Sequence, residues 1–134
     1  AESGQAANDP AGLREAVKWG WKFDLPMFIT ANGCDDSRDD FRRSYLAEHV
    51  HTLWHMVNFN APVRGYFHWP FTALFVGEQG GSAMLGLGGV PPQPHRRTRR
   101  QSADFYAEIC RTGSLSSEMV EKYCPEVFGK IFPV

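Results

Sequence analysis

The sequence predicts an α/β fold whose parallel strands belong to a larger sheet or barrel. Helical and strand-like segments alternate along the chain, and this order produces βαβ units with parallel strands. Only two extended strand-like segments occur within the 134 residues. Parallel strands are covered on both faces and paired at their edges, so two of them are too few to form a closed structure.

The segment before the first strand has the pattern of a capped helix. Asp9 can accept hydrogen bonds from free N–H groups, and Pro10 suits the first helical position. Apolar residues then recur at helical spacing. A short apolar run, residues 27–31, follows and ends at Asn32 and Gly33, which form a turn signal. This run predicts the first buried strand.

A long helix is predicted from about Asp39 to Phe59, followed by a second strand over residues 63–69. Pro62 precedes that strand, a position that suits proline. The expected apolar face of the helix comprises Tyr45, Leu46, Val50, Leu53, Trp54 and Val57, and the expected solvent side comprises Arg42, Arg43, Glu48 and His51.

The chain after the second strand, residues 70–94, is rich in glycine and proline. Loops of this length are uncommon in compact domains, so the segment is expected to be functional, mobile or docked on a neighbour. Two helices follow, near 102–112 and 116–124. Ser102 is expected to cap the first of them, Gly113 to end it, and Ser116 or Ser117 to cap the second.

The composition is typical of a globular chain, and its net charge favours no charged partner. The hydrophobic fraction is 43%, the charged fraction is 22% and the formal net charge is -1. This balance provides no field that would attract nucleic acid. No apolar run approaches the ~20 residues that span a bilayer. Neither nucleic acid nor a membrane is therefore expected as a partner.

The cysteines predict a reducing compartment. Cys34, Cys110 and Cys124 lack metal-ligand spacing. Reduced, partly buried thiols are favoured over one intermolecular disulfide. The first residues lack the basic start and apolar centre of a signal peptide. The sequence therefore predicts a cytoplasmic protein without a cofactor.

Other polar clusters are explained better by solvent exposure than by binding. His51 and His55 have the i, i+4 spacing that can share a metal, but no carboxylate completes a zinc signature, so surface or packing histidines are favoured. The arginines within residues 95–100 can hold phosphate, although a solvated loop or pairing with an acidic partner surface is favoured. The acidic run 35–40 lacks EF-hand spacing and is expected to be a solvated helix N-terminus. No metal site is predicted.

Several segments, in order along the chain, resemble motifs of glycoside hydrolase family 1, the β-glucosidase-type enzymes. Residues 26–33 read Pro-Met-Phe-Ile-Thr-Ala-Asn-Gly, similar to the family strand that ends in Thr-Glu-Asn-Gly. Residues 63–69 read Val-Arg-Gly-Tyr-Phe-His-Trp, similar to the next barrel strand. Residues 10–14 resemble the start of the preceding helix. Further matches are Arg38, Tyr45, Leu46 and His49 in the long helix, and Ser102, Ala103 and Tyr106 in the last barrel helix.

This resemblance implies an eight-stranded (β/α) barrel with its active site at the carboxyl ends of the strands. Residues 1–134 would supply only the seventh and eighth strands with their helices, which is an incomplete barrel of the TIM type. The family's acid/base glutamate belongs to an earlier strand, outside this sequence. A retaining glycosidase needs that group and a nucleophilic carboxylate about 5–5.5 Å apart.

The departures from the family pattern fall at pocket positions. Ala31 takes the place of the nucleophilic glutamate, and a methyl group can neither attack nor stabilise positive charge. The family's sugar-binding glutamate and tryptophan align with Val76 and Gly77. Trp69 remains, and the resemblance implies a platform under a sugar ring. No catalytic residue is assigned, and only weak β-glycoside binding at Trp69 is expected.

Two classes of function fit these features. The first is a non-catalytic, β-glycosidase-like structural or interaction subunit that completes or decorates a larger assembly. The alternative is a fragment, or an engineered nucleophile-less form, of a retaining β-glucosidase that acts on or binds β-glycosides. Another polypeptide or further copies of the chain are expected at the open sheet edges, with residues 70–94 and 129–134 as candidate contact segments.

Overall fold

The computed structural model describes residues 8–36, 38–70, 74–75, 84–85, 88–89 and 98–133. The elements in chain order are α1 (Pro10–Trp21), β1 (Met27–Asn32), α2 (Asp40–Asn58), β2 (Val63–His68), β3 (Leu74–Phe75), β4 (Met84–Leu85), β5 (Gly88–Gly89), β6 (Thr98–Arg99), α3 (Gln101–Thr112), α4 (Ser117–Tyr123), the 3-10 helix η2 (Pro125–Val127) and α5 (Phe128–Ile131). Within these ranges, no helix combines the length and apolarity that a bilayer crossing requires.

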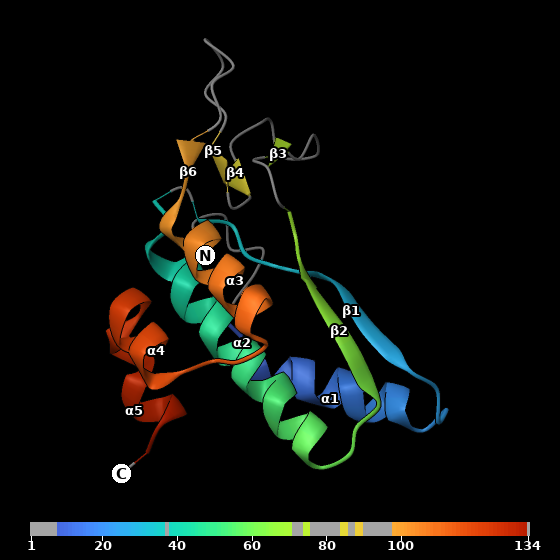
Figure 1. Cartoon of the computed structure of the whole chain (residues 1–134). Helices are drawn as coiled ribbons and strands as arrows, with labels where there is room; N and C mark the ends of the chain where they lie inside the picture. The colour runs from blue at the N-terminus through green and yellow to red at the C-terminus, as the bar shows by residue number, and fades with distance from the viewer. Residues whose placement is uncertain are drawn as a thin grey trace.

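The main sheet consists of β1 and β2, which are adjacent and parallel as predicted. Phe28 pairs with Gly65 and Ile29 with Tyr66, and the pairing reaches Asn32 opposite His68. Each strand has one neighbour, so both outer edges of this sheet are unpaired within the described residues. The helices α1, α2 and α3 lie on the same side of the strand pair (Figure 1). The architecture is therefore an open α/β arrangement.

The faces of β1 and β2 differ in burial, which corrects the prediction that both strands are buried. Met27 and Ile29 pack against the core formed by α1 and α2. Phe28 and Phe67 point away from it and are 56% and 57% exposed. The physical reason is that the described helices cover one face of the sheet only, and a parallel sheet needs cover on both.

The burial of α2 departs from its expected pattern at three positions. Arg42, predicted on the solvent side, has 0% exposure. Trp54 and Val57, predicted on the apolar face, are exposed. Leu46 and Ala47 pack in a core with α3 and the C-terminal helices, whereas Leu53 and Met56 pack in another core with α1. The helix therefore has no single apolar stripe along its length.

Two of the three predicted N-cap positions are occupied by a residue whose side chain caps its helix, and the third is not. Asp9 caps α1 by accepting a hydrogen bond from Gly12 N at 2.9 Å, and Ser116 caps α4 through Met119 N. These caps and the end of α3 at Gly113, with φ 65°, confirm the predictions. Ser102 is not a cap, because α3 begins one residue earlier and its side chain is buried against Asp39 instead.

The acidic segment before α2 is mostly buried, which corrects the prediction of a solvated helix start. Asp35, Asp36 and Asp39 are buried, and Asp40 alone of the four is exposed. The Arg42 guanidinium group accompanies two of them, since it donates to an Asp39 carboxylate oxygen and to the Asp36 carbonyl.

The C-terminal helices close a second apolar core against α2. Phe105, Val120 and Ile131 are buried in it, and Phe132 packs against it. The tail predicted as a candidate contact segment therefore docks on this chain. The segment 70–94, predicted as a loop, contains β3, which pairs with β4, and β5, which pairs with β6. Its other residues after Pro70 lie outside the described residues.

Candidate functional site

The candidate site lies where β1 and β2 end. Ala31 is the exposed penultimate residue of β1, and Trp69 follows β2 with 43% of its surface exposed. The Trp69 N–H donates to the Asn32 carbonyl at 3.1 Å, so the two strand ends are held together. The structure thus brings Ala31 and Trp69 to the same edge of the sheet, as expected for parallel strands.

Gly33 fixes how closely the two strand ends approach. A Cβ atom at this position would lie 1.7 Å from the Trp69 carbonyl oxygen, a distance that no side chain can adopt. The sequence interpretation of Gly33 as a turn residue is therefore incomplete, because the glycine is required by close backbone approach rather than by a positive φ.

Asn32 links the strand ends to the helices behind them. Its Nδ2 donates to the Tyr45 hydroxyl at 3.1 Å, and its Oδ1 accepts from the Tyr66 hydroxyl at 2.8 Å. Burial raises the pKa of Tyr45 to about 12 and that of Tyr66 well above its usual value of 10. Both phenols therefore stay protonated near neutral pH, and they orient the amide from its two sides: the Tyr66 hydroxyl donates to the amide oxygen, and the Tyr45 hydroxyl accepts from the amide nitrogen.

His68 extends this network along β2. Its Nδ1 lies 3.1 Å from the Tyr66 hydroxyl, and the Tyr106 hydroxyl donates to the Tyr66 carbonyl at 3.0 Å. Burial, with a smaller contribution from the Arg42 charge, lowers the pKa of His68 to about 4. The ring is therefore neutral at pH 7, and the network behind the strand ends carries no charge there.

A buried ionic cluster stands next to this network and ties α2 to α3. Arg42 Nη1 donates to Asp39 Oδ1 at 2.7 Å, and its Nη2 donates to the Asp36 carbonyl at 2.6 Å. The other Asp39 oxygen accepts from Ser102 N at 2.9 Å. Arg100, from the predicted arginine patch, donates to the Asp36 carbonyl at 3.0 Å. This cluster positions the elements and presents no free carboxylate to a ligand.

The described residues provide no nucleophile at the strand ends. Ala31 offers a methyl group, and the Cys34 thiol is buried, which raises its pKa to about 12. Within the described residues, no group of three or more His, Cys, Asp and Glu side chains can hold a metal. Trp69 presents an exposed ring, while Val76 and Gly77 lie outside the described residues.

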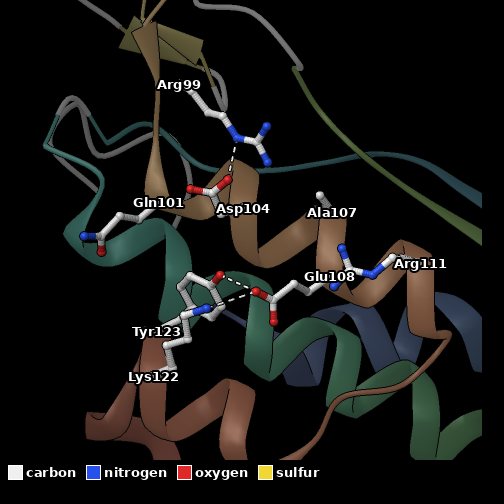
Figure 2. Close-up of a pocket in the computed structure, with 8 residues that line it drawn as sticks. All are labelled: Arg99, Gln101, Asp104, Ala107, Glu108, Arg111, Lys122 and Tyr123. Atoms are coloured by element: carbon white, nitrogen blue, oxygen red, sulfur yellow. Dashed lines mark hydrogen bonds and ion pairs between the residues drawn. The ribbon is translucent and has the colours of Figure 1, made fainter.

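Away from the strand ends, a hollow between α3 and α4 is lined by charged groups (Figure 2). It has a volume of about 420 Å³ and a lining of mixed charge. Arg99 pairs with Asp104, and Glu108 accepts from the Tyr123 hydroxyl at 2.6 Å and from Lys122 Nζ at 3.1 Å. Because these charges are paired with one another, the hollow is a surface feature of the helix packing.

Comparisons with known proteins assign the chain to a family. The family model described as Glycosyl hydrolase family 1 matches residues 2–114, and the chain belongs to this family. It is 34% identical over 111 residues to a beta-galactosidase of Saccharolobus solfataricus, covering 82% of this chain and 23% of that protein. It is 31% identical over 131 residues to Klotho of Rattus norvegicus, covering 92% of this chain and 12% of that protein.

A solved structure of the same family gives the place of the chain in the fold. The hyperthermophilic beta-glucosidase from Pyrococcus furiosus matches with a TM-score of 0.80 and 31% identity, covering 89% of this chain and 26% of that one. The chain therefore spans about a quarter of the length of such relatives. It forms part of a TIM-type barrel, with parallel strands and an open sheet.

The polar network behind the strand ends was missed by sequence reasoning. From the sequence, Tyr45 is expected on an apolar helix face and Asn32 in a turn, and both fall in family-like motifs, but no hydrogen bond between them is predicted. Tyr66 and His68 fall on alternate positions of β2, directed toward the helices. That alternation of polar-tipped residues in a strand next to a helix is the signal that could have found them.

Proposed function

We propose that this chain supplies the last two βα units of a family 1 barrel with a methyl group at the nucleophile position, and that it hydrolyses no β-glycoside. The observation that carries the proposal is Ala31, exposed at the carboxyl end of β1 beside Trp69. A retaining mechanism needs a carboxylate there to attack the anomeric carbon and a second carboxyl group about 5–5.5 Å away. The methyl group has neither a lone pair nor a charge.

The chain acts in this proposal as a structural or interaction subunit. Phe28, Phe67 and Trp69 are exposed on the sheet, and the exposed rings of Trp19 in α1 and Phe23 just after it meet edge to face with centroids 5.2 Å apart. Single exposed apolar residues are ordinary, but Phe28 and Phe67, which both lie over Gly65 on a sheet with unpaired edges, favour a protein partner. The partner we propose is a polypeptide, or further copies of this chain, that pairs with the outer edges of β1 and β2.

The second candidate is a fragment of a longer β-glycosidase-like protein. The observation that favours it is coverage, because the chain spans 23% of the beta-galactosidase relative while matching it at 34% identity. Trp69 would then stack under a sugar bound mostly by other strands. The coding sequence upstream of Ala1 separates the candidates: an in-frame segment with the Asn-Glu-Pro acid/base motif supports the fragment.

Hydrolysis of 4-nitrophenyl β-glucoside tests the proposed lack of activity. We expect no sustained release of nitrophenol above background, because barrier reductions of ~8 kcal/mol or more require the absent carboxylates. Ala31→Glu should also stay inactive, since the acid/base strand is absent from this sequence. The isosteric Ala31→Gln variant is its control, and a complete family 1 beta-glucosidase is the positive control.

Turnover that survives repurification of the unmodified chain would overturn the proposal. It would mean that a group other than residue 31 attacks the sugar. Activity gained by Ala31→Glu and not by Ala31→Gln would support the assignment of residue 31 to the nucleophile position. It would also overturn the claim that the chain cannot form a working site.

A further inference from the structure

Two histidines on the outer side of α2 form a pair that the proposed function does not use. His51 and His55 are one helical turn apart, and their ring centroids are 4.5 Å apart with planes inclined by 66°. Both side chains are half-buried, so they are accessible from solvent. Trp54 borders both rings, with centroid distances of 5.8 Å to His51 and 4.9 Å to His55.

The separation of the rings matches the geometry of shared metal coordination. Imidazole nitrogens bind Zn²⁺ at about 2.0–2.1 Å, which places each ring centre about 3.2 Å from the ion. Two such rings subtending about 90–110° at the ion have centres about 4.5–5.2 Å apart. The observed 4.5 Å lies within this range, so the spacing of the two rings is compatible with one shared ion.

We propose that His51 and His55 bind one divalent transition-metal ion of the class that prefers imidazole, which comprises Zn²⁺, Ni²⁺ and Cu²⁺. The two side chains occupy adjacent coordination positions, and water fills the others. Glu48 lies one turn before His51 but is not a third ligand, since its carboxylate is bonded to Asn8 at 3.0 Å and to Lys130 at 3.5 Å.

The surroundings allow access and set a limit on affinity. A cavity of about 560 Å³ between α1 and α2 is lined by His55 and by Arg14. It gives a hydrated ion access to His55, while His51 is reached from a separate hollow of about 250 Å³ that Trp54 also lines. The guanidinium of Arg14 is close enough to act on the charge of His51, so it opposes a bound cation. Arg14→Gln should therefore tighten metal binding.

The pair is remote from the strand ends and does not depend on the proposed function. It occupies the second half of α2, while Asn32 and Tyr45 link the strand ends to the first half of that helix. Metal binding would therefore leave Trp69 unaffected.

Fluorescence quenching by Cu²⁺ tests the site on the untagged chain. Trp54 borders both histidines, so Cu²⁺ bound there should quench it in a saturable way. His51→Gln and His55→Gln keep a good helix former at each position and should each weaken binding by at least tenfold. Trp54→Phe should still bind Cu²⁺ by calorimetry but lose most of the quenching, whereas Trp19→Phe, on α1, should keep it.

Two results would overturn the proposal. One is saturable quenching of equal affinity in the double variant His51→Gln/His55→Gln, which would place the ion elsewhere. The other is the absence of heat and of quenching in the unmodified chain up to millimolar Cu²⁺, Ni²⁺ and Zn²⁺. Circular dichroism of each variant verifies that α2 remains helical.

Discussion

Arg42 is the charged residue on which most of the buried polar structure depends. Its side chain has 0% exposure and donates to Asp39 and to the Asp36 carbonyl. A buried ion pair adds little net stability over a well-packed apolar pair, but removing one partner leaves the other charge buried and uncompensated. The largest loss of folding stability is therefore expected for variants that remove only one partner of the ion pair.

Arg42→Leu should lower the free energy of unfolding by about 3–5 kcal/mol, because Asp39 loses its counter-charge in a buried site. Urea unfolding at fixed protein concentration measures this change. Lys18→Ala is the control: its exposed pair with Glu15 at 2.8 Å should contribute less than about 1 kcal/mol. Equal effects of the two substitutions would contradict the assigned role of Arg42.

His68 makes stability depend on pH between about 4 and 6.5. Its pKa is lowered from 6.5 to about 4 in the folded chain, mainly by burial, so the unfolded state binds more protons in this window. The contribution of His68 to the free energy of unfolding is fully present above pH 6.5 and is lost as the pH falls, by about 2 kcal/mol between pH 7 and pH 5. His68→Gln should remove this part of the pH dependence in urea unfolding. An unchanged slope would show that other groups, such as His49, cause it.

At the scale of elements, the order and positions of the long helices and strands follow from the sequence. Local signals suffice there: Asp9 and Pro10 start α1, and the positive φ of Asn60 ends α2 before Pro62 and β2. Burial could not be predicted in the same way. Arg42 lies inside because elements distant in sequence enclose α2, and Phe28 is exposed because no described element covers its face.

The cap of α1 provides a test at this scale. Asp9→Ala should destabilise the chain by about 1 kcal/mol, since Gly12 N loses its acceptor at 2.9 Å. Asp9→Asn should retain most of the stability because the amide oxygen can accept the same bond. Thermal unfolding compares the three proteins. If Asp9→Asn lost as much stability as Asp9→Ala, charge at the helix end rather than hydrogen bonding would explain the cap.

At the scale of the whole molecule, the resemblance predicted the family and the partial barrel, and both are confirmed. The alternation in β2 can place Tyr66 on the helix side, but its bond to Asn32 could not be predicted, since the pairing of residues 34 positions apart depends on the tertiary fold. The assignments of Ala31, Val76 and Gly77 to lost active-site positions stay predictions.

The open sheet predicts association. The purified chain should sediment as an oligomer or complex heavier than 15.1 kDa, because unpaired strand edges and exposed Phe28 and Phe67 favour a partner. Phe28→Glu/Phe67→Glu should shift it toward monomer, whereas Phe59→Glu, on the outer end of α2, should not. A well-folded monomer with cooperative unfolding would contradict this prediction.

The segment between Trp69 and Arg100 is anchored at both ends by hydrogen bonds, and this has a consequence for its evolution. Trp69 is bonded to Asn32, and Arg100 and Ser102 are bonded to Asp36 and Asp39, so both anchors are fixed by partners outside the segment. Doubling the length of a loop between fixed ends costs only about 0.6 kcal/mol. Insertions and deletions that leave the β3–β4 and β5–β6 pairs intact should therefore cost little folding free energy, and the stretch between these anchors can diverge in length while the scaffold around it stays constant.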